Sequence, residues 1–211
     1  MQEQEAHCSQ DEGREGMESP LIINLVGAPG AGKSTLAAYV FARLKMEGVN
    51  CELVTEFAKD KVWEKNNTAL ANQVYIFAKQ YYRIDRCAGK VDVIITDSPL
   101  ILSGFYNRDP EIDRPLKDLI AAINRKYTNY TYFVKRVKAY NPVGRNETEA
   151  ESDAYVSRIK ELLDQHGVFS RSIDGDLLSA DIIVSEVRDW LEEKGKSETK
   201  KEERESHVHE Q

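Results

Sequence analysis

A glycine-rich segment directly after a short apolar run constrains the fold of this chain more than any other feature. The apolar run is LIINLV at residues 21–26, which is typical of a strand buried on both faces. The stretch GKSTLAAYVFARLK at residues 32–45 has the apolar spacing of a helix. The segment that joins the apolar run to the helical stretch, and overlaps the start of the latter, matches the pattern G-x-x-x-x-G-K-[ST]. It consists of Gly27, Ala28, Pro29, Gly30, Ala31, Gly32, Lys33 and Ser34, followed by Thr35.

A strand, a tight loop and a helix in this order are suited to binding the phosphate tail of a nucleotide. Glycines let backbone N–H groups approach phosphate oxygens, and the helix directs its positive dipole end at the same anion. We expect Lys33 to reach the β- and γ-phosphates, the Ser34 hydroxyl to bind Mg²⁺, and Thr35 to contact the α-phosphate. The predicted ligands are therefore ATP and Mg²⁺, with a preference for adenine or guanine left open.

Strands and helices alternate along the rest of the chain. Parallel strands joined by right-handed helical crossovers give an α/β sheet covered on both faces. Thr148 and Glu151 are predicted to cap the helix that begins at residue 149. Further strands are predicted at 51–55, 91–96, 131–134 and 182–184, and further helices at 69–87, 114–124, 149–165 and 187–191.

Charge is concentrated at the two ends of the chain. Of the net charge of −7, residues 1–20 contribute −5 (six acids, one base) and residues 192–211 contribute −2 (seven acids, five bases). The body is therefore neutral, which is not typical of proteins that bind duplex nucleic acid or anionic membranes. We predict one domain at residues 20–191, with disordered charged tails at 1–19 and 192–211.

Two further features bear on where such a chain works. Cys8, Cys51 and Cys87 lack the spacing of a zinc site or a disulfide framework, and no apolar run approaches the ~20 residues of a membrane span. The opening residues MQEQEAH do not resemble a secretory or mitochondrial leader. The expected location is the cytoplasm.

Asp97 ends the apolar run VDVIIT and is the second candidate for the nucleotide site. The carboxyl ends of parallel strands meet at one edge of a sheet, so Asp97 and Lys33 are expected to lie close together there. An acid at this place can hold Mg²⁺ through water. The alternative is that Asp97 only caps a loop.

The loop GAPGAGKST, the strand end TDSPL, a basic segment near residue 140 and the sequence DGD at 174–176 together resemble the nucleoside and nucleotide kinases of the P-loop superfamily. Within that superfamily the chain is most similar to proteins grouped with the nicotinamide-ribose kinase domain. The likeness covers residues 20–191. It implies a three-layer P-loop NTPase fold with a five-stranded parallel sheet of order 2-3-1-4-5, a mobile lid, and a last strand after DGD whose preceding loop lies against the adenine.

The lid candidate is the basic segment RVKAYNPVGRNE at residues 136–147, with Pro142 and Gly144 as hinges. Phosphoryl transfer depends on positioning and charge neutralisation, so we expect Arg136 and Arg145 to close over the γ-phosphate. The alternative is a solvated basic loop without a catalytic role.

Glu56 follows the second predicted strand, where the similar kinases carry an acid that acts as a base toward a sugar hydroxyl. A base is useful for a hydroxyl acceptor, because its proton must leave, but not for a phosphate acceptor. Glu56 therefore favours a hydroxyl, unless it only caps a turn or pairs with Lys59. The chain departs from the deoxynucleoside kinases where Ser98-Pro99, rather than an arginine, follows Asp97.

In the similar kinases the helix matching residues 69–87 lines the pocket for the base. Phe77 and Tyr81 are expected in the core. The candidate contacts to the substrate, besides Glu56, are Gln73, Gln80, Arg83 and Tyr106. The predicted partner is a small-molecule phosphoryl acceptor, and the chain is expected to be a monomer or a homodimer.

These features predict an ATP- and Mg²⁺-dependent phosphotransferase that acts on a nucleoside, a nucleotide or a related small molecule. One alternative is a P-loop ATPase that drives a partner, although the chain has no NKxD motif and carries Ser98 where such ATPases often have an acid. Another is a kinase of modified bases or ends in nucleic acid, against which the neutral body argues.

Overall fold

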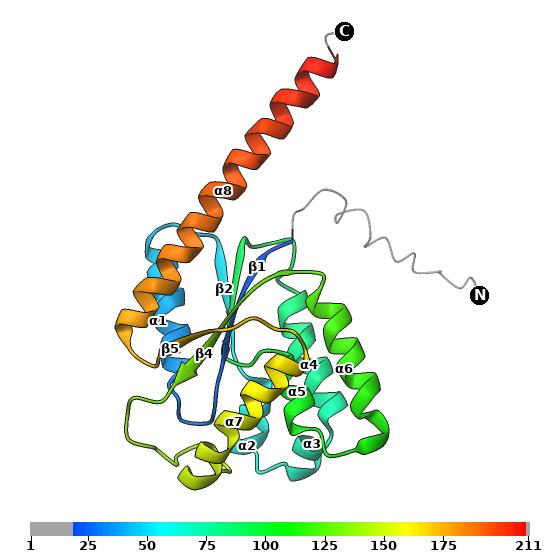
Figure 1. Cartoon of the computed structure of the whole chain (residues 1–211), viewed down its shortest axis with the longest axis vertical. Helices are drawn as coiled ribbons and strands as arrows, with labels where there is room; N and C mark the ends of the chain where they lie inside the picture. Colours follow the sequence, from blue (N-terminus) through cyan, green and yellow to red (C-terminus); the bar gives the residue numbers. More distant parts are fainter. Residues whose placement is uncertain (1–18, 210–211) are drawn as a thin grey trace, which may run out of the picture.

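The centre of the molecule is a parallel sheet with the order β2-β3-β1-β4-β5 (Figure 1), which confirms the predicted order. The computed structural model describes residues 19–209, apart from the side chains of residue 198 and of residues 200–209. All but the last residue of the predicted tail at 1–19 therefore lies outside the described residues. The strands are β1 (Leu21–Val26), β2 (Cys51–Val54), β3 (Val93–Thr96), β4 (Thr128–Lys135) and β5 (Arg171–Asp174).

Helices cover both faces of the sheet. One apolar core lies between the sheet and the pair α1 (Lys33–Met46) and α8 (Leu177–His209). The other lies between the sheet and a group of four helices, α4 (Gln73–Asp85), α5 (Ile101–Tyr106), α6 (Pro110–Asn124) and α7 (Glu149–Gln165). Two short helices, α2 (Phe57–Trp63) and α3 (Asn67–Ala71), lie at the end of the sheet toward which β4 points (Figure 1).

Strand β1 has both faces buried, as its apolar sequence predicts. Leu21, Ile23 and Leu25 pack in the core under α1 and α8. Ile22 and Val26 pack in the core on the opposite face. Side chains alternate between the faces of a strand, so a central strand must be apolar on both. Its carboxyl end therefore delivers the glycine-rich loop to a fixed edge of the sheet.

The predicted strand at 182–184 is wrong, because these residues lie inside α8. Ala180, Ile183, Val184 and Val187 are all buried, and this spacing is that of one helical face packed against the sheet. The true fifth strand, RSID, has one buried apolar residue, Ile173, and so lacks the apolar run that marks a central strand. The DGD segment at 174–176 therefore begins at the last residue of β5 and follows this strand, instead of preceding the last strand as predicted.

The predicted helix at 69–87 is two helices that meet at Asn72. The Asn72 side chain accepts a hydrogen bond from Tyr75 N at 3.0 Å and begins α4. The buried residues of α4 are Gln73, Ile76, Phe77, Gln80 and Ile84. Helices α2 and α5, which the sequence analysis did not predict, occupy the ends of β2 and β3.

Helix α7 begins as predicted. Thr148 Oγ1 accepts from Glu151 N at 3.3 Å, and Glu151 Oε2 accepts from Thr148 N at 2.7 Å. At the other end of the chain, α8 is helical to His209 and extends beyond the sheet (Figure 1), so residues 192–209 have helical backbone where an irregular tail was predicted.

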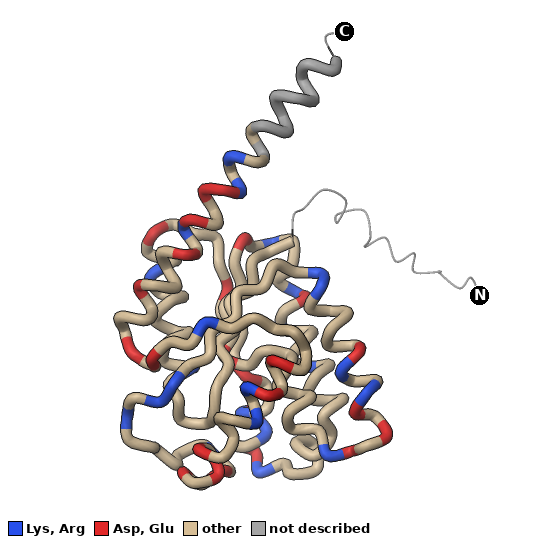
Figure 2. The backbone as a smooth tube through the Cα atoms, in the orientation of Figure 1, with Lys and Arg blue, Asp and Glu red and all other residues tan. Residues whose placement is uncertain are grey.

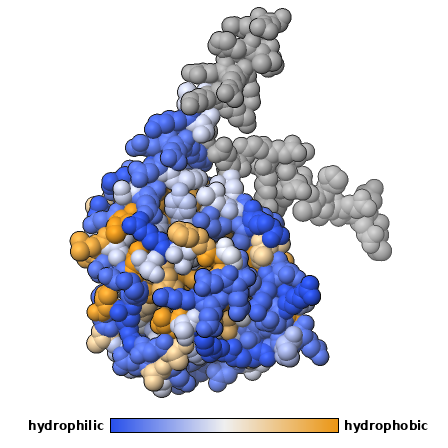
Figure 3. Space-filling view, viewed as in Figure 1, coloured by the Kyte–Doolittle hydropathy of each residue, from blue (hydrophilic) through white to orange (hydrophobic). Residues whose placement is uncertain are grey.

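Charged and apolar residues are mixed over the described surface. Figure 2 shows Lys and Arg interspersed with Asp and Glu over the body, and Figure 3 shows a face that is mainly hydrophilic with separate apolar patches. Within residues 19–209, no helix combines the length and apolar character needed to cross a membrane.

Candidate active site

The glycine-rich loop leaves β1 and enters α1 through left-handed backbone. Gly30 has φ +85° and Gly32 has φ +100°, a region that favours glycine. Gly32 is also the N-cap of α1, and no side chain caps this helix. Backbone N–H groups in the first turn of α1 are therefore available for an anion, which the helix dipole favours at the same place.

Neighbouring chain segments press against this loop. A Cβ atom on Gly27 would lie 2.6 Å from Val134 O, and one on Gly32 would lie 3.3 Å from Gly175 O. Ser152 Oγ of α7 donates to Pro29 O at 2.6 Å in a buried hydrogen bond. The loop is thus held by the end of β4, by the turn after β5 and by α7, so its shape is fixed by three elements distant in sequence.

Alanine at Gly30 tests whether the loop and the lid are coupled. A Cβ atom there would lie 2.8 Å from the Tyr140 ring, whereas at Gly48, with nearly the same φ of +82°, it would meet nothing within 4 Å. Both Gly→Ala variants should lose about 1–2 kcal/mol of unfolding free energy in denaturant titrations, because alanine is strained at this φ. Only Gly30→Ala should also raise the KM for ATP, by displacing Tyr140. Equal KM values in the two variants would contradict the coupling.

Lys33 begins α1 and its side chain folds back over the loop. Its Nζ donates to Gly27 O at 2.7 Å and to Ala28 O at 3.1 Å. Burial lowers the pKa of Lys33, while the carboxylates of Glu56 and Asp97 act in the opposite direction. The structure therefore brings together the three residues that the sequence placed at the ends of β1, β2 and β3.

Asp97 follows β3 and is 4% exposed. Its Oδ1 atom is buried and has no hydrogen-bond partner among the described residues. A buried polar oxygen without a hydrogen-bond partner costs free energy of folding, and a bound ligand would remove this cost. The Ser34 hydroxyl is exposed on the first turn of α1. A carboxylate and a hydroxyl are hard oxygen donors, and this pair fits a hydrated Mg²⁺ ion.

Glu56 lies at the start of α2, directly beyond the end of β2, and its side chain makes no capping hydrogen bond. Burial raises the pKa of Glu56, Lys33 opposes this shift, and the Asp97 carboxylate adds to it. A half-buried carboxyl with a raised pKa is a suitable proton acceptor near neutral pH. The alternative role of the Glu56 side chain, as a turn cap, is not seen.

Gln80 and Arg83 of α4 hold the backbone around Glu56. Gln80 Oε1 accepts from Phe57 N at 2.8 Å, and Arg83 Nη1 donates to Thr55 O at 3.1 Å. Arg83 also forms an ion pair with Asp60 at 2.5 Å. Gln73 Nε2 donates to Leu70 O at 2.8 Å. These predicted substrate contacts all have partners within the protein, and their contact with a substrate stays a prediction.

Tyr106 ends α5 and is half-buried beside the acids of the site. Burial raises the pKa of Tyr106, and the carboxylates of Glu147 and Glu56 add to the shift. Glu147 also acts electrostatically on Lys33. In the sequence Glu147 is only the last residue of the predicted lid segment, and nothing in its local pattern distinguishes it from a capping acid.

Arg136 is held at the base of the predicted lid by acids of α7. Its Nη2 contacts Asp153, and Glu149 Oε1 lies 3.3 Å from the same atom. Its Nη1 is buried without a hydrogen-bond partner among the described residues. A buried guanidinium N–H without an acceptor has capacity for an anionic ligand.

Tyr140, which the sequence analysis did not single out, connects the lid to the loop. Its ring lies over Gly30, and the guanidinium groups of Arg136 and Arg145 lie 5.4 and 5.8 Å from its centroid. Arg145 is exposed, and its Nε donates to Asn141 O at 2.8 Å. Gly144 packs on the Trp63 ring of α2. The segment 136–147 therefore spans from the phosphate loop to the acceptor side.

Comparisons with known proteins agree with this geometry. A search of curated proteins finds no match. Among solved structures, a deoxyadenosine kinase from M. mycoides with bound dATP is similar, with 16% sequence identity, a TM-score of 0.51, and coverage of 81% of this chain and 99% of that one. This likeness supports a P-loop kinase fold. The family model described as AAA domain matches residues 22–177, and the chain belongs to that family.

Proposed function

We propose that this protein transfers the γ-phosphoryl group of MgATP to a hydroxyl of a nucleoside-like small molecule. The observation that carries the proposal is the half-buried Glu56 carboxyl, with its raised pKa, within electrostatic reach of Lys33 and Asp97. A kinase of hydroxyl groups needs a proton acceptor close to the phosphate loop. Hydrolysis also needs a proton acceptor, for the attacking water, so the destination of the phosphoryl group is what separates a kinase from an ATPase.

The loop residues would bind the triphosphate of ATP. Lys33 would exchange its carbonyl partners Gly27 O and Ala28 O for phosphate oxygens. Ser34 and Asp97 would hold Mg²⁺, which neutralises charge on the phosphates. Arg136, through its unpartnered Nη1, and Arg145, on the lid, would bind the phosphoryl group as it moves.

The acceptor would enter between α2, α5 and the lid. As its oxygen bonds to the γ-phosphorus, the bond from that phosphorus to the bridging oxygen of ADP breaks, and Glu56 takes the hydroxyl proton. Two half-buried rings that would contact a planar base, Tyr106 and Tyr155, lie nearby. Both pack edge-on against the buried Phe105 ring, with centroids 4.9 and 5.0 Å away.

The charge of the acceptor side favours a neutral or cationic acceptor over a phosphorylated one. Glu147 and Glu56 both raise the pKa of Tyr106, against a smaller opposite effect of Arg108, so two carboxylates lie near the place where the acceptor would sit. A second phosphate would be repelled by them. This is consistent with the resemblance to nucleoside and nicotinamide-ribose kinases.

A screen of acceptors with labelled ATP and Mg²⁺ tests this assignment. Pooled nucleosides or nicotinamide riboside should accept label, whereas pooled nucleoside monophosphates should accept little, because of the carboxylates. The Lys33→Ala variant serves as the control for contaminating kinases. Transfer only to monophosphates would contradict the hydroxyl assignment while leaving a kinase in place.

A further inference from the structure

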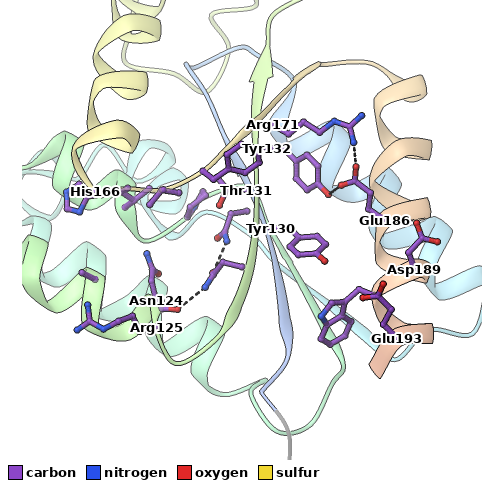
Figure 4. A pocket seen from close by; sticks show the side chains of 18 residues that line it. Asn124, Arg125, Tyr130, Thr131, Tyr132, His166, Arg171, Glu186, Asp189 and Glu193 are labelled. Carbon is purple, nitrogen blue, oxygen red and sulfur yellow. Dashed lines mark hydrogen bonds and ion pairs between the residues drawn. The ribbon is translucent and has the colours of Figure 1, made fainter. Parts of the chain in front are cut away.

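A wide groove in the described part of the chain lies away from the phosphate loop. It is a groove of about 910 Å³ beside the first half of β4, toward the amino ends of the strands (Figure 4). The phosphate loop lies at the opposite end, where Lys135 closes β4 and its carbonyl accepts from Gly175 N at 2.9 Å. None of the residues assigned to phosphoryl transfer lines the groove.

The floor of the groove is the uncovered edge of β4. This strand has eight residues, but β5 pairs only with Tyr132–Lys135. On its inner side, β4 pairs with β1 from Thr128 onward. Among the described residues, the outer edge of 128–131 therefore has no neighbouring strand. Such an edge presents unpaired N–H and C=O groups, which are a template for another strand.

The groove extends around both faces of this edge. Tyr130 and Tyr132 pack on the side of α1 and α8. Asn129, the alternate residue, donates to Asn124 O of α6 at 2.8 Å and so lies on the opposite side. Because residues of both faces line one cavity, the cavity lies in the plane of the sheet, between the two helical layers. It has the position of a missing strand, in line with β5.

Acidic residues of α8 form one wall. Glu186, Asp189 and Glu193 line the groove along this helix (Figure 4). Glu186 is paired with Arg171 and accepts from Tyr132 Oη at 2.5 Å. The carboxylates of Asp189 and Glu193 form no ion pair within the described part of the chain. This wall therefore presents two unneutralised negative charges beside an aromatic surface of Tyr130 and Trp190.

We propose that this groove binds an extended peptide of a partner protein as an additional strand on β4, with Lys or Arg at the alternate positions that face α8. The proposal goes beyond the kinase activity and does not depend on it. Main-chain pairing with residues 128–131 would supply affinity, and Asp189 and Glu193 would select basic side chains. Four residues of strand span about 13 Å, so a hexapeptide covers the edge.

The test uses the full chain and the blocked hexapeptide acetyl-KTKTKT-amide at low ionic strength. It should bind at least about tenfold tighter than acetyl-ETETET-amide, because of the acidic wall. Hydrogen exchange should show new protection of amides within residues 128–131. A version of the basic peptide that is N-methylated at alternate residues should not bind, because it cannot pair with the strand.

Two charge reversals on α8 provide a matched pair of variants. Asp189→Lys should weaken binding of the basic peptide about tenfold. Glu192 lies one turn further along α8 and does not line the groove, so Glu192→Lys should weaken binding less than about twofold. Phosphoryl transfer should be unchanged in both. No binding, equal binding of the acidic or N-methylated peptide, protection at another surface, or equal effects of the two variants would each overturn the proposal. So would protection of 128–131 in the peptide-free chain, since another segment or a second copy would then fill the groove.

Discussion

Replacing Lys33 with alanine is expected to lower kcat for phosphoryl transfer by about 10³-fold or more. The Lys33 ammonium group lies on the loop, 2.7 Å from Gly27 O and within electrostatic reach of Glu56 and Asp97. Without it, charge that develops on the transferred phosphoryl group loses its nearest fixed cation. Steady-state kinetics with MgATP and the acceptor found in the screen measure this effect.

Lys45→Ala is the matched control for this substitution. Lys45 is an exposed lysine in the last turn of the same helix, α1. Its loss should leave kcat within about twofold of the wild-type value, since surface substitutions of this kind are nearly neutral. A Lys33→Ala protein that folds normally and keeps wild-type activity would contradict the assignment of the loop.

Replacing Glu56 with glutamine is expected to lower kcat by about 10²–10⁴-fold with a smaller change in the acceptor KM, because the variant lacks the proton acceptor. In the wild type, kcat should rise as the pH passes upward through the raised pKa of Glu56 and then level off. The variant should lose this acid limb. Glu64→Gln, at the exposed end of α2, should keep both the rate and the limb.

The same substitution should stabilise the protein. Because burial raises the folded-state pKa of Glu56 above its unfolded value, ionised Glu56 costs stability. This cost is absent below the unfolded pKa, grows as the pH rises, and is complete above the folded pKa. Glu56→Gln should therefore unfold at a higher denaturant concentration than the wild type at neutral pH and show no such gain at low pH. A Glu56→Gln variant with the kcat of the wild type would contradict the role of Glu56 as a base. Unchanged stability of the same variant would contradict the cost of burying its charge.

The sequence was most informative where local chemistry and fold coincide. The loop at 27–35 requires glycine at left-handed positions and a lysine at a helix start, so its place after β1 was predictable. Asp97 was recognisable because it directly follows a buried apolar strand, and the capping box at Thr148 because two side chains three positions apart form it. These features depend on residues close in sequence.

The sequence-based predictions were wrong or incomplete where tertiary packing, and not the local sequence, determines the structure. Ile182–Val184 is rich in β-branched residues, but burial against α1 and the sheet makes it part of a helix, while the true β5 is an edge strand with one buried apolar residue. Tyr140 acquires its place over Gly30 only through folding of the lid, and Glu147 reaches Lys33 and Tyr106 from a distant part of the chain. No local pattern reports contacts of this kind.

The destination of the γ-phosphoryl group of ATP tests the central claim most directly. Phosphorus NMR of a reaction containing the protein, MgATP and pooled nucleosides distinguishes a phosphomonoester from inorganic phosphate. The account predicts that a phosphomonoester appears in step with ADP, and that it requires both Lys33 and Glu56. Release of inorganic phosphate alone, at the same rate with and without the nucleosides, would contradict it and show an ATPase.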